Sequence, residues 1–295
     1  MRSIVGNLFN WANAPRLIGK FTGVVPKVWV VTGNVNTTSQ VAGNGFGIQS
    51  AGLIAGGYTT TNIARTEEYD GSIWTNSNNL STARRQAATG GIQSDAFIVG
   101  GYGGSRLTST EEYNGSSWSA GGTISVGTDD TRGCGTSTNA GLMAGGTTGT
   151  GRTTNANIYN GATWSATGAL NVGVVVHFMV GTTGAAISFG GHIGPYTNKT
   201  EIFNGTTWSV GNNLPASIVN HNGAGNAGDA ICFGGHDGVN TRNETYAYNG
   251  TIWSTLAATL NLARNTHGGG GTSQLAYAVT GDVVVGRTAT TENYG

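Results

Sequence analysis

The chain repeats one pattern of residues six times, and this repetition constrains the fold more than any other feature. In each copy an apolar stretch ends in a pair of glycines, a polar segment follows, and an aromatic residue then precedes a turn, usually Asn-Gly or Asp-Gly. The glycine pairs begin at Gly56, Gly100, Gly145, Gly190 and Gly234, and a degenerate sixth copy has Thr280 as its first residue. Successive copies start 44, 45, 45, 44 and 46 residues apart.

A tryptophan closes each unit, three to four residues beyond the turn. These residues are Trp74, Trp118, Trp164, Trp208 and Trp253. The sixth unit has none because the chain stops at Gly295, whereas Trp29 precedes the tryptophan of the first unit by 45 residues.

Each part of the unit predicts a local structure. Asn-Gly between two short strands indicates a two-residue type I′ hairpin, in which both turn residues have positive φ. The apolar run ending in Gly-Gly indicates a strand buried on both faces, with glycines where backbones approach closely or turn sharply. Tyrosine and tryptophan on the outer strands should pack between neighbouring sheets. A unit of this length with about four strands is typical of a propeller blade.

The order of glycine pair, aromatic residue and tryptophan at this spacing resembles the kelch repeat of β-propellers over residues 28 to 295. The expected fold is all-β, a six-bladed propeller of four-stranded antiparallel blades. In kelch propellers one blade commonly combines strands from both chain ends. The resemblance therefore implies that a strand around Trp29 completes the blade formed by residues 264 to 294, which would leave no exposed sheet edge.

Residues 1 to 27 precede the repeat and form a candidate docking arm. Ile4, Leu8 and Phe9 fall on one face of a possible helix that ends before Pro15, with Trp11 beside it. One interpretation is that this arm inserts into another protein or another copy of the chain. The other is that it packs on its own propeller, and the residues leave both open.

Composition excludes several classes of partner. The net charge is zero, there are three lysines, and no apolar run is long enough to span a membrane. We therefore expect a soluble protein with no nucleic-acid partner and no membrane insertion. Cys134 and Cys232 fall in different predicted blades, too far apart for a disulfide, and are expected to be small core residues.

Counting 13 residues back from the first position of each glycine pair gives a column of residues on the innermost strands, which should line the central channel. Its members are Gly43, Ala87, Arg132, His177, His221 and His267. Imidazoles converging on an axis are suited to binding a metal or an anion. The alternative is that these side chains bond to neighbouring backbone and stay apart in a wide channel. This alternative is preferred, so neither a metal site nor a cofactor is expected.

The residue after each glycine pair opens a loop on one face, and each loop also carries one basic residue. The candidate ligand-binding residues are Tyr58, Tyr102, His192, His236, Arg106, Arg152, Arg242 and Arg287, with Thr147, Asp282, Arg65 and Lys199 at the remaining positions. Aromatic rings with planar donors around a shallow bowl suit saccharides and other polar ligands. The alternative, which is preferred, is that each cation pairs with a carboxylate nearby, as Arg65 with Glu67 or Arg242 with Glu244, and contributes little energy.

No enzymatic activity is expected, because the sequence has no nucleophile motif, no phosphate-binding loop and no pair of carboxylates on the predicted channel wall. The near-identical blades and the sequence of residues 110 to 119, Thr-Glu-Glu-Tyr-Asn-Gly-Ser-Ser-Trp-Ser, resemble kelch-type propellers encoded by bacteriophages. This resemblance implies a virion protein of the tail, fibre or capsid surface. Its partners would be other virion proteins, copies of itself or a host-surface glycan. The alternative is a freestanding carbohydrate-binding propeller, extracellular or cytoplasmic.

Overall fold

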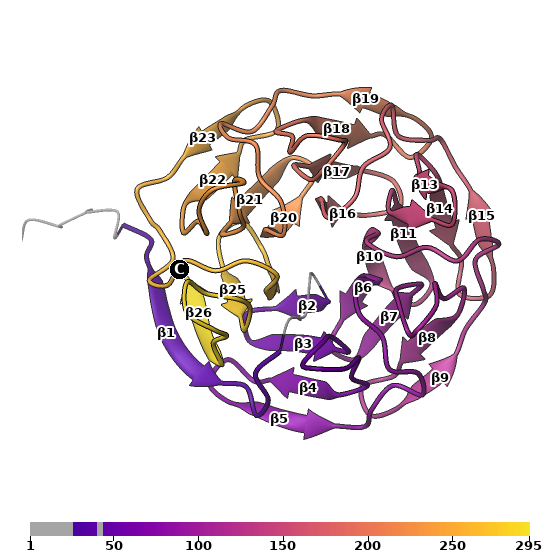
Figure 1. Ribbon diagram of the computed structural model, residues 1–295, viewed down its shortest axis with the longest axis horizontal. Coiled ribbons are helices and arrows are strands. Elements are labelled where there is room, and N and C mark those ends of the chain that lie inside the picture. The colour runs from indigo at the N-terminus through magenta and orange to yellow at the C-terminus, as the bar shows by residue number, and fades with distance from the viewer. Residues whose placement is uncertain (1–25, 40–43) are drawn as a thin grey trace, which may run out of the picture.

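The computed structural model describes residues 26–39 and 44–295, and Figure 1 shows six small sheets set around a central axis. Each sheet has four antiparallel strands, and the chain passes from one sheet to the next around the ring. The protein is therefore an all-β, six-bladed propeller, as the repeat predicts. The described residues contain no helix, and hence none long and apolar enough to cross a membrane.

The first three blades follow in chain order, each built from the axis outwards. Blade 1 consists of β2 (Gly45–Ile48), β3 (Ala51–Ala55), β4 (Thr66–Tyr69) and β5 (Trp74–Ser77). Blade 2 consists of β6 (Ala88–Ile92), β7 (Asp95–Val99), β8 (Thr110–Tyr113) and β9 (Trp118–Ala120). Blade 3 consists of β10 (Arg132–Ser137), β11 (Ala140–Ala144), β14 (Ala156–Tyr159) and β15 (Trp164–Ala166), with a short hairpin of β12 (Thr147–Thr148) and β13 (Gly151–Arg152) in its loop.

The remaining three blades continue around the ring. Blade 4 consists of β16 (Phe178–Gly181), β17 (Ala186–Phe189), β18 (Thr200–Phe203) and β19 (Trp208–Val210). Blade 5 consists of β20 (Asn222–Asn226), β21 (Asp229–Phe233), β22 (Thr245–Tyr248) and β23 (Trp253–Thr255). Blade 6 takes three strands from the end of the chain, β24 (Gly268–Gly271), β25 (Ala276–Val279) and β26 (Thr290–Tyr294), and its outermost strand is β1 (Trp29–Asn34).

The closure of blade 6 confirms the expectation drawn from Trp29. In β1 this residue lies opposite Tyr294, the same register that places Trp74 opposite Tyr69 in blade 1. The side-chain amide of Asn261 donates a hydrogen bond of 2.7 Å to the Trp29 carbonyl. The two ends of the chain are thus joined in one sheet, which pairs an edge that a linear array would leave open.

The apolar runs form the second strands, and these are buried on both faces, as expected. In β7 the residues from Ala96 to Val99 are fully buried. The glycine pairs that follow turn sharply, with φ of +65° at Gly100, where an added Cβ would lie 2.6 Å from the Thr128 carbonyl oxygen. Thr280 adopts the same conformation, with φ of +56°, and its buried hydroxyl has no partner among the described residues. A β-branched residue there is strained.

The turns between the third and fourth strands differ from the prediction. Tyr113 pairs directly with Trp118, so the connection has four residues, and the type I′ turn of two residues is wrong. Gly115 has positive φ and Asn114 does not. Instead, the Asn114 side-chain oxygen accepts hydrogen bonds from the backbone N–H groups of Ser116 and Ser117. Asparagine is therefore used here as an acceptor that closes the loop.

The tryptophans join neighbouring blades, as expected for large rings on the outer strands. The Trp74 indole N–H donates a 2.7 Å hydrogen bond to the hydroxyl of Thr291 in the preceding blade, and Trp74 also contacts Tyr277 of that blade edge-on. The same indole–hydroxyl bond links Trp29 to Thr245, Trp118 to Thr66, Trp164 to Thr110 and Trp253 to Thr200. These bonds join adjacent blades at five of the six junctions, all except that between blades 3 and 4.

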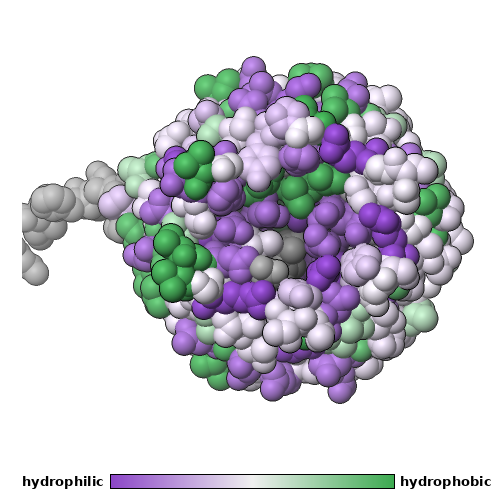
Figure 2. All heavy atoms as spheres, in the orientation of Figure 1, coloured by the Kyte–Doolittle hydropathy of each residue, from purple (hydrophilic) through white to green (hydrophobic). Residues whose placement is uncertain are grey.

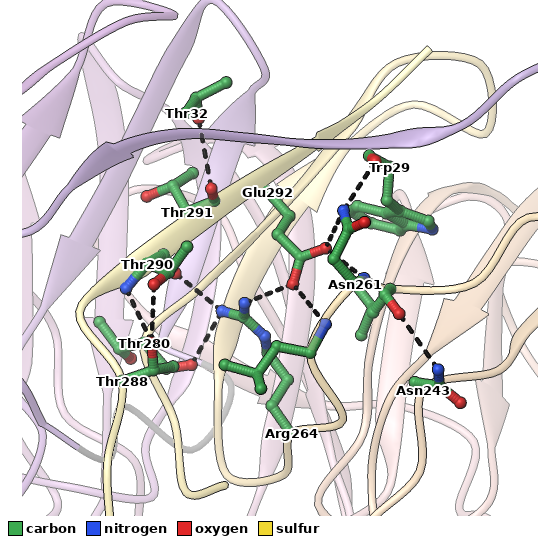
Figure 3. Close-up of polar contacts among 12 residues, drawn as sticks. Trp29, Thr32, Asn243, Asn261, Arg264, Thr280, Thr288, Thr290, Thr291 and Glu292 are labelled. Atoms are coloured by element: carbon green, nitrogen blue, oxygen red, sulfur yellow. Dashed lines mark hydrogen bonds and ion pairs between the residues drawn. The ribbon is translucent and has the colours of Figure 1, made fainter.

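A buried ion pair holds the connection between blades 5 and 6 against β26 of blade 6. Arg264 and Glu292 are both fully buried, and their side chains lie 2.6 Å apart (Figure 3). Arg264 also donates to the carbonyl oxygens of Thr280 and Thr290, and Glu292 accepts from the backbone N–H of Asn261. A buried ion pair is tolerated where further hydrogen bonds satisfy its charged groups, and here only Arg264 Nε has no partner among the described residues.

The cysteines occupy the predicted places in the core. Cys134 lies on the innermost strand of blade 3 and Cys232 on the second strand of blade 5, and both are buried and free. Burial raises the pKa of the Cys134 thiol to about 12. The docking arm, with Ile4, Leu8, Phe9 and Trp11, lies outside the described residues except for its last two positions.

Candidate functional site

The innermost strands surround a central channel that contains a cavity of about 140 Å³. Most of its lining residues are glycines of those strands, such as Gly90, Gly135 and Gly270, and none of the lining residues is charged. Figure 2 shows hydrophilic residues gathered around the middle of the face turned to the viewer. The side chains of the channel wall are therefore mostly small and uncharged, and polar residues lie around the mouth of the channel.

The predicted column of Arg132, His177, His221 and His267 does not line this channel. All four residues are buried, and none is among the residues that line the cavity. Each histidine directly precedes an innermost strand and points towards the preceding blade: an added Cβ on the first glycine of that blade's pair would lie within 3 Å of its ring. Gly43, the first member of the column, lies outside the described residues.

The position of Arg132 in the column is also wrong. The register between β10 and β11 shifts between Gly135 and Ser137, so this hairpin is longer than the others and counting 13 residues back slips by one. Thr131 is the true equivalent, because the residue before it, Asp130, has the positive φ found before each histidine.

Two of the three histidines, His177 and His221, bond to neighbouring backbone, which is the preferred alternative, whereas the ring nitrogens of His267 have no hydrogen-bond partner among the described residues. His177 Nε2 donates to the Ala144 carbonyl at 3.1 Å, so Nδ1 accepts from the Ser188 hydroxyl at 2.7 Å. His221 Nε2 likewise donates to the Phe189 carbonyl. Burial, together with the charge of Arg132, lowers the pKa of both imidazoles to about 3, so both are neutral at physiological pH. Their role is to hold adjacent blades together.

Arg132 is a separate buried charge. Its Nη1 donates to the Thr131 carbonyl at 2.8 Å, and burial lowers its pKa to about 10. The Asp130 carboxylate faces it, and burial raises the pKa of that carboxyl. Arg132 is buried, whereas the Asp130 side chain is partly exposed.

The loops that follow the glycine pairs form the rim of the channel. Their first residues lie beside the chain that enters each innermost strand, as shown by backbone pairing of Tyr102 with Arg85 and of His192 with Val175. His236 pairs in the same way with Val219. The fold therefore brings the residues after the six glycine pairs to one face, as the sequence predicts for their loops.

Where blades 6, 1 and 2 meet, the rim carries guanidinium groups that lie over tyrosine rings. The Arg85 guanidinium lies over the rings of Tyr58 and Tyr102, at 4.5 and 5.2 Å from their centroids. Arg287 lies 5.9 Å from the Tyr58 ring and donates to the Thr59 carbonyl at 2.7 Å. These side chains are partly exposed and form a continuous surface of aromatic rings and planar donors.

Blades 4 and 5 contribute a second aromatic group. Tyr196 contacts the rings of His192 and His236 edge-on, with centroids 5.6 and 6.4 Å apart. In the segment that begins with His236, the Arg242 side chain bonds to Asp237, at 3.0 Å, and to Glu244, at 2.9 Å.

The preferred ion-pair interpretation is confirmed for several of the basic residues. Arg65 pairs with Glu67 at 2.6 Å, Arg106 with Asp129 at 2.7 Å and Arg287 with Asp282 at 3.3 Å, in addition to Arg242 with Glu244. Arg152 and Lys199 are exposed and have no ion pair to another described residue.

Sequence reasoning missed Arg85 and Tyr196. Arg85 lies outside the loop that follows its glycine pair, two residues before Ala87, the same interval that separates Val175 from His177. That interval was a usable signal, because the residue there pairs with the loop. Tyr196 comes four residues after His192 and reaches across to the next blade.

The site therefore defines a propeller with a polar, aromatic rim on one face. Among the described residues, no group of three or more histidine, cysteine, aspartate or glutamate side chains is placed to hold a metal ion. No protein-family model matches the sequence, and a comparison with curated proteins finds no match. The six-bladed architecture thus stands on the structure, and the kelch resemblance stays a prediction.

Proposed function

We propose that the protein is a non-enzymatic binding propeller of a bacteriophage particle, which contacts other virion proteins or the host surface through its rim. The observation that carries the proposal is the stacking of Arg85 on Tyr58 and Tyr102 at the mouth of the channel. Tyrosine and arginine are among the residues enriched at binding hot spots.

Exposed apolar side chains beside the rim support a contact role. Val239 in blade 5 and Val284 and Val285 in blade 6 lie in loops that follow the glycine pairs, and each is more than four-fifths exposed. Apolar residues at neighbouring loop tips are typical of surfaces that are covered by a partner. The setting in a phage particle rests on the resemblance of the repeat to phage-encoded kelch propellers.

A freestanding carbohydrate-binding propeller is the second candidate. It is favoured by the tyrosine rings and planar donors of the rim, which suit the faces and hydroxyl groups of sugars. A free lectin would bind sugar without residues 1 to 22, whereas a virion component would need them for attachment.

The experiment is a cell-binding assay with labelled full-length protein and a panel of aquatic bacteria. Wild-type protein should bind the surface of at least one host, and a triple variant with Tyr58→Ser, Arg85→Gln and Tyr102→Ser should lose that binding. A matched control replaces exposed side chains of the turns, Ile73→Ser and Ile252→Ser, and should bind as wild type. Equal binding by the triple variant would exclude the rim as the contact surface. Absence of binding to every host, together with no antibody labelling of phage particles, would overturn the function.

A further inference from the structure

A second cavity, of about 180 Å³, lies beside blade 3, away from the channel. Its lining includes Ser125 and Val126 from the connection between blades 2 and 3, and Gly145, Asn155 and Asn157 from blade 3 itself. None of its lining residues is charged. The repeat shows what fills the equivalent place in other blades.

In blade 2 that place holds a buried arginine. Arg84 stands three residues before Ala87, as Thr128 stands three before Thr131. Arg84 Nη1 donates to the carbonyl oxygens of Gly100 and Ser109, at 3.0 and 2.9 Å. The equivalent carbonyls in blade 3 belong to Gly145 and Asn155, and both residues line the cavity.

The same place in blade 2 also holds a carboxylate. Glu111 accepts hydrogen bonds from the backbone N–H and the hydroxyl of Ser81 and from the backbone N–H of Thr82. Ser125 and Val126 occupy these two positions in blade 3, and their N–H groups bond to no other described residue. Asn157 stands in the place of Glu111.

The other blades fill the position by different means. Blade 6 repeats the ion pair with Arg264 and Glu292, whereas blades 4 and 5 place the buried side chains of Val174 and Ile218 where Arg84 stands. Blade 3 therefore keeps donors and acceptors arranged for an ion pair but supplies neither charged side chain.

The charge of the lining decides what kind of group fits. A lone carboxylate would use only the N–H donors of the lining, as Glu201 does in blade 4 with the N–H groups of Asn171 and Val172, and a lone cation would use only the carbonyl acceptors. A ligand that carries both charges uses both sets of groups at once. In blade 2 the Arg84 nitrogen and the Glu111 oxygen lie 2.8 Å apart. In an α-amino acid the bond lengths place the ammonium nitrogen about 2.7 Å from the nearer carboxylate oxygen.

We infer that the blade 3 cavity binds a small zwitterion of the α-amino-acid class. The ligand carboxylate accepts hydrogen bonds from the N–H groups of Ser125 and Val126 and from the Ser125 hydroxyl. The ligand ammonium donates to the carbonyl oxygens of Gly145 and Asn155. This binding is independent of the rim and of the function proposed for it.

The test is ligand-observed NMR and calorimetry on the full-length protein with four probes. Glycine and L-alanine should bind in the millimolar range. Glycolate, which keeps the carboxylate alone, and methylamine, which keeps the cation alone, should each bind at least about tenfold more weakly, because one set of charge-assisted hydrogen bonds is lost.

Two variants separate binding in this cavity from binding elsewhere. Thr128→Ile copies the apolar filling of blades 4 and 5, and the double variant Thr128→Arg with Asn157→Glu copies the ion pair of blade 2. Each should abolish glycine binding, and Thr60→Ile, at an exposed position of blade 1, should leave it unchanged. The inference is overturned if glycine does not bind, if glycolate and methylamine bind as well as glycine, or if the folded Thr128 variants bind as wild type does.

Discussion

Ala156 stands where the five other blades hold a threonine, and Trp208, which packs in the same buried cluster, has an indole N–H without a hydrogen-bond partner among the described residues. In the other blades that threonine hydroxyl accepts the bond from the tryptophan of the next blade. The contact between blades 3 and 4 is therefore weaker than its equivalents, because a buried donor without a partner costs free energy.

Restoring the missing hydroxyl should stabilise the protein. Ala156→Thr gives Trp208 Nε1 an acceptor and should raise the free energy of unfolding by about 1 kcal/mol. Urea denaturation followed by tryptophan fluorescence measures the change. Ala156→Val adds the same shape without the hydroxyl, so a gain as large in that variant would attribute the effect to packing and not to the hydrogen bond.

The buried pair of Arg264 and Glu292 should be strongly coupled. Arg264→Met leaves the Glu292 carboxylate buried without its counter-charge and should lower the free energy of unfolding by about 3–5 kcal/mol. The double variant Arg264→Met with Glu292→Leu should lose less than the sum of the two single changes, as measured by a double-mutant cycle in urea. Strict additivity would contradict this. Arg152→Met, at an exposed position, should change stability by less than about 0.5 kcal/mol.

Acid should destabilise the propeller through its buried histidines. The pKa values of His177 and His221 are lowered by burial from 6.5 to about 3. Between these values the unfolded chain binds more protons than the folded chain. Stability is therefore complete above pH 6.5 and falls as the pH is lowered, by about 1.4 kcal/mol per pH unit for each histidine.

Denaturation curves at a series of pH values measure this slope. The double variant Ile73→Ser with Ile252→Ser changes two exposed side chains and no titratable group, so it should keep the slope of wild type. A free energy of unfolding that stays constant from about pH 7 to about pH 5 would show that the buried imidazoles take up protons without cost.

Truncation should separate the arm from the strand that closes the ring. A chain that starts at Gly23 keeps β1 and should melt at the same temperature as the full-length protein, whereas one that starts at Gly33 loses Trp29 and should be destabilised by several kcal/mol. If residues 1 to 22 mediate assembly, light scattering should show an oligomer for the full-length chain and a monomer for the Gly23 variant. Two monomers would exclude self-assembly through the arm and would favour the free carbohydrate-binding alternative.

The blade architecture could be predicted because it depends on spacing alone. The interval from Trp29 to Trp74 equals the later intervals, and a strand so placed can pair with β26 in one register only if the buried side chains are to stay inside. The loops after the glycine pairs were likewise placed correctly, since each pair ends a second strand at the same edge of its blade.

The side-chain details could not be read from spacing. Counting back from Gly145 misplaced Arg132, because one additional residue in the hairpin of blade 3 changes which side chain faces the neighbouring blade. The Asn-Gly turns were misassigned because Asn114 can accept hydrogen bonds from the loop, which competes with the two-residue turn. The stacking of Arg85 on Tyr58 joins two blades, and no local pattern reports a contact between segments 27 residues apart.

The position of β1 decides how the protein can be held. This strand is the outermost of blade 6, so whatever precedes Pro26 joins the domain at its circumference (Figure 1). If the segment before Pro26 acts as the proposed docking arm, its partner would hold the disc at the edge beside β1 and not at the rim of the channel.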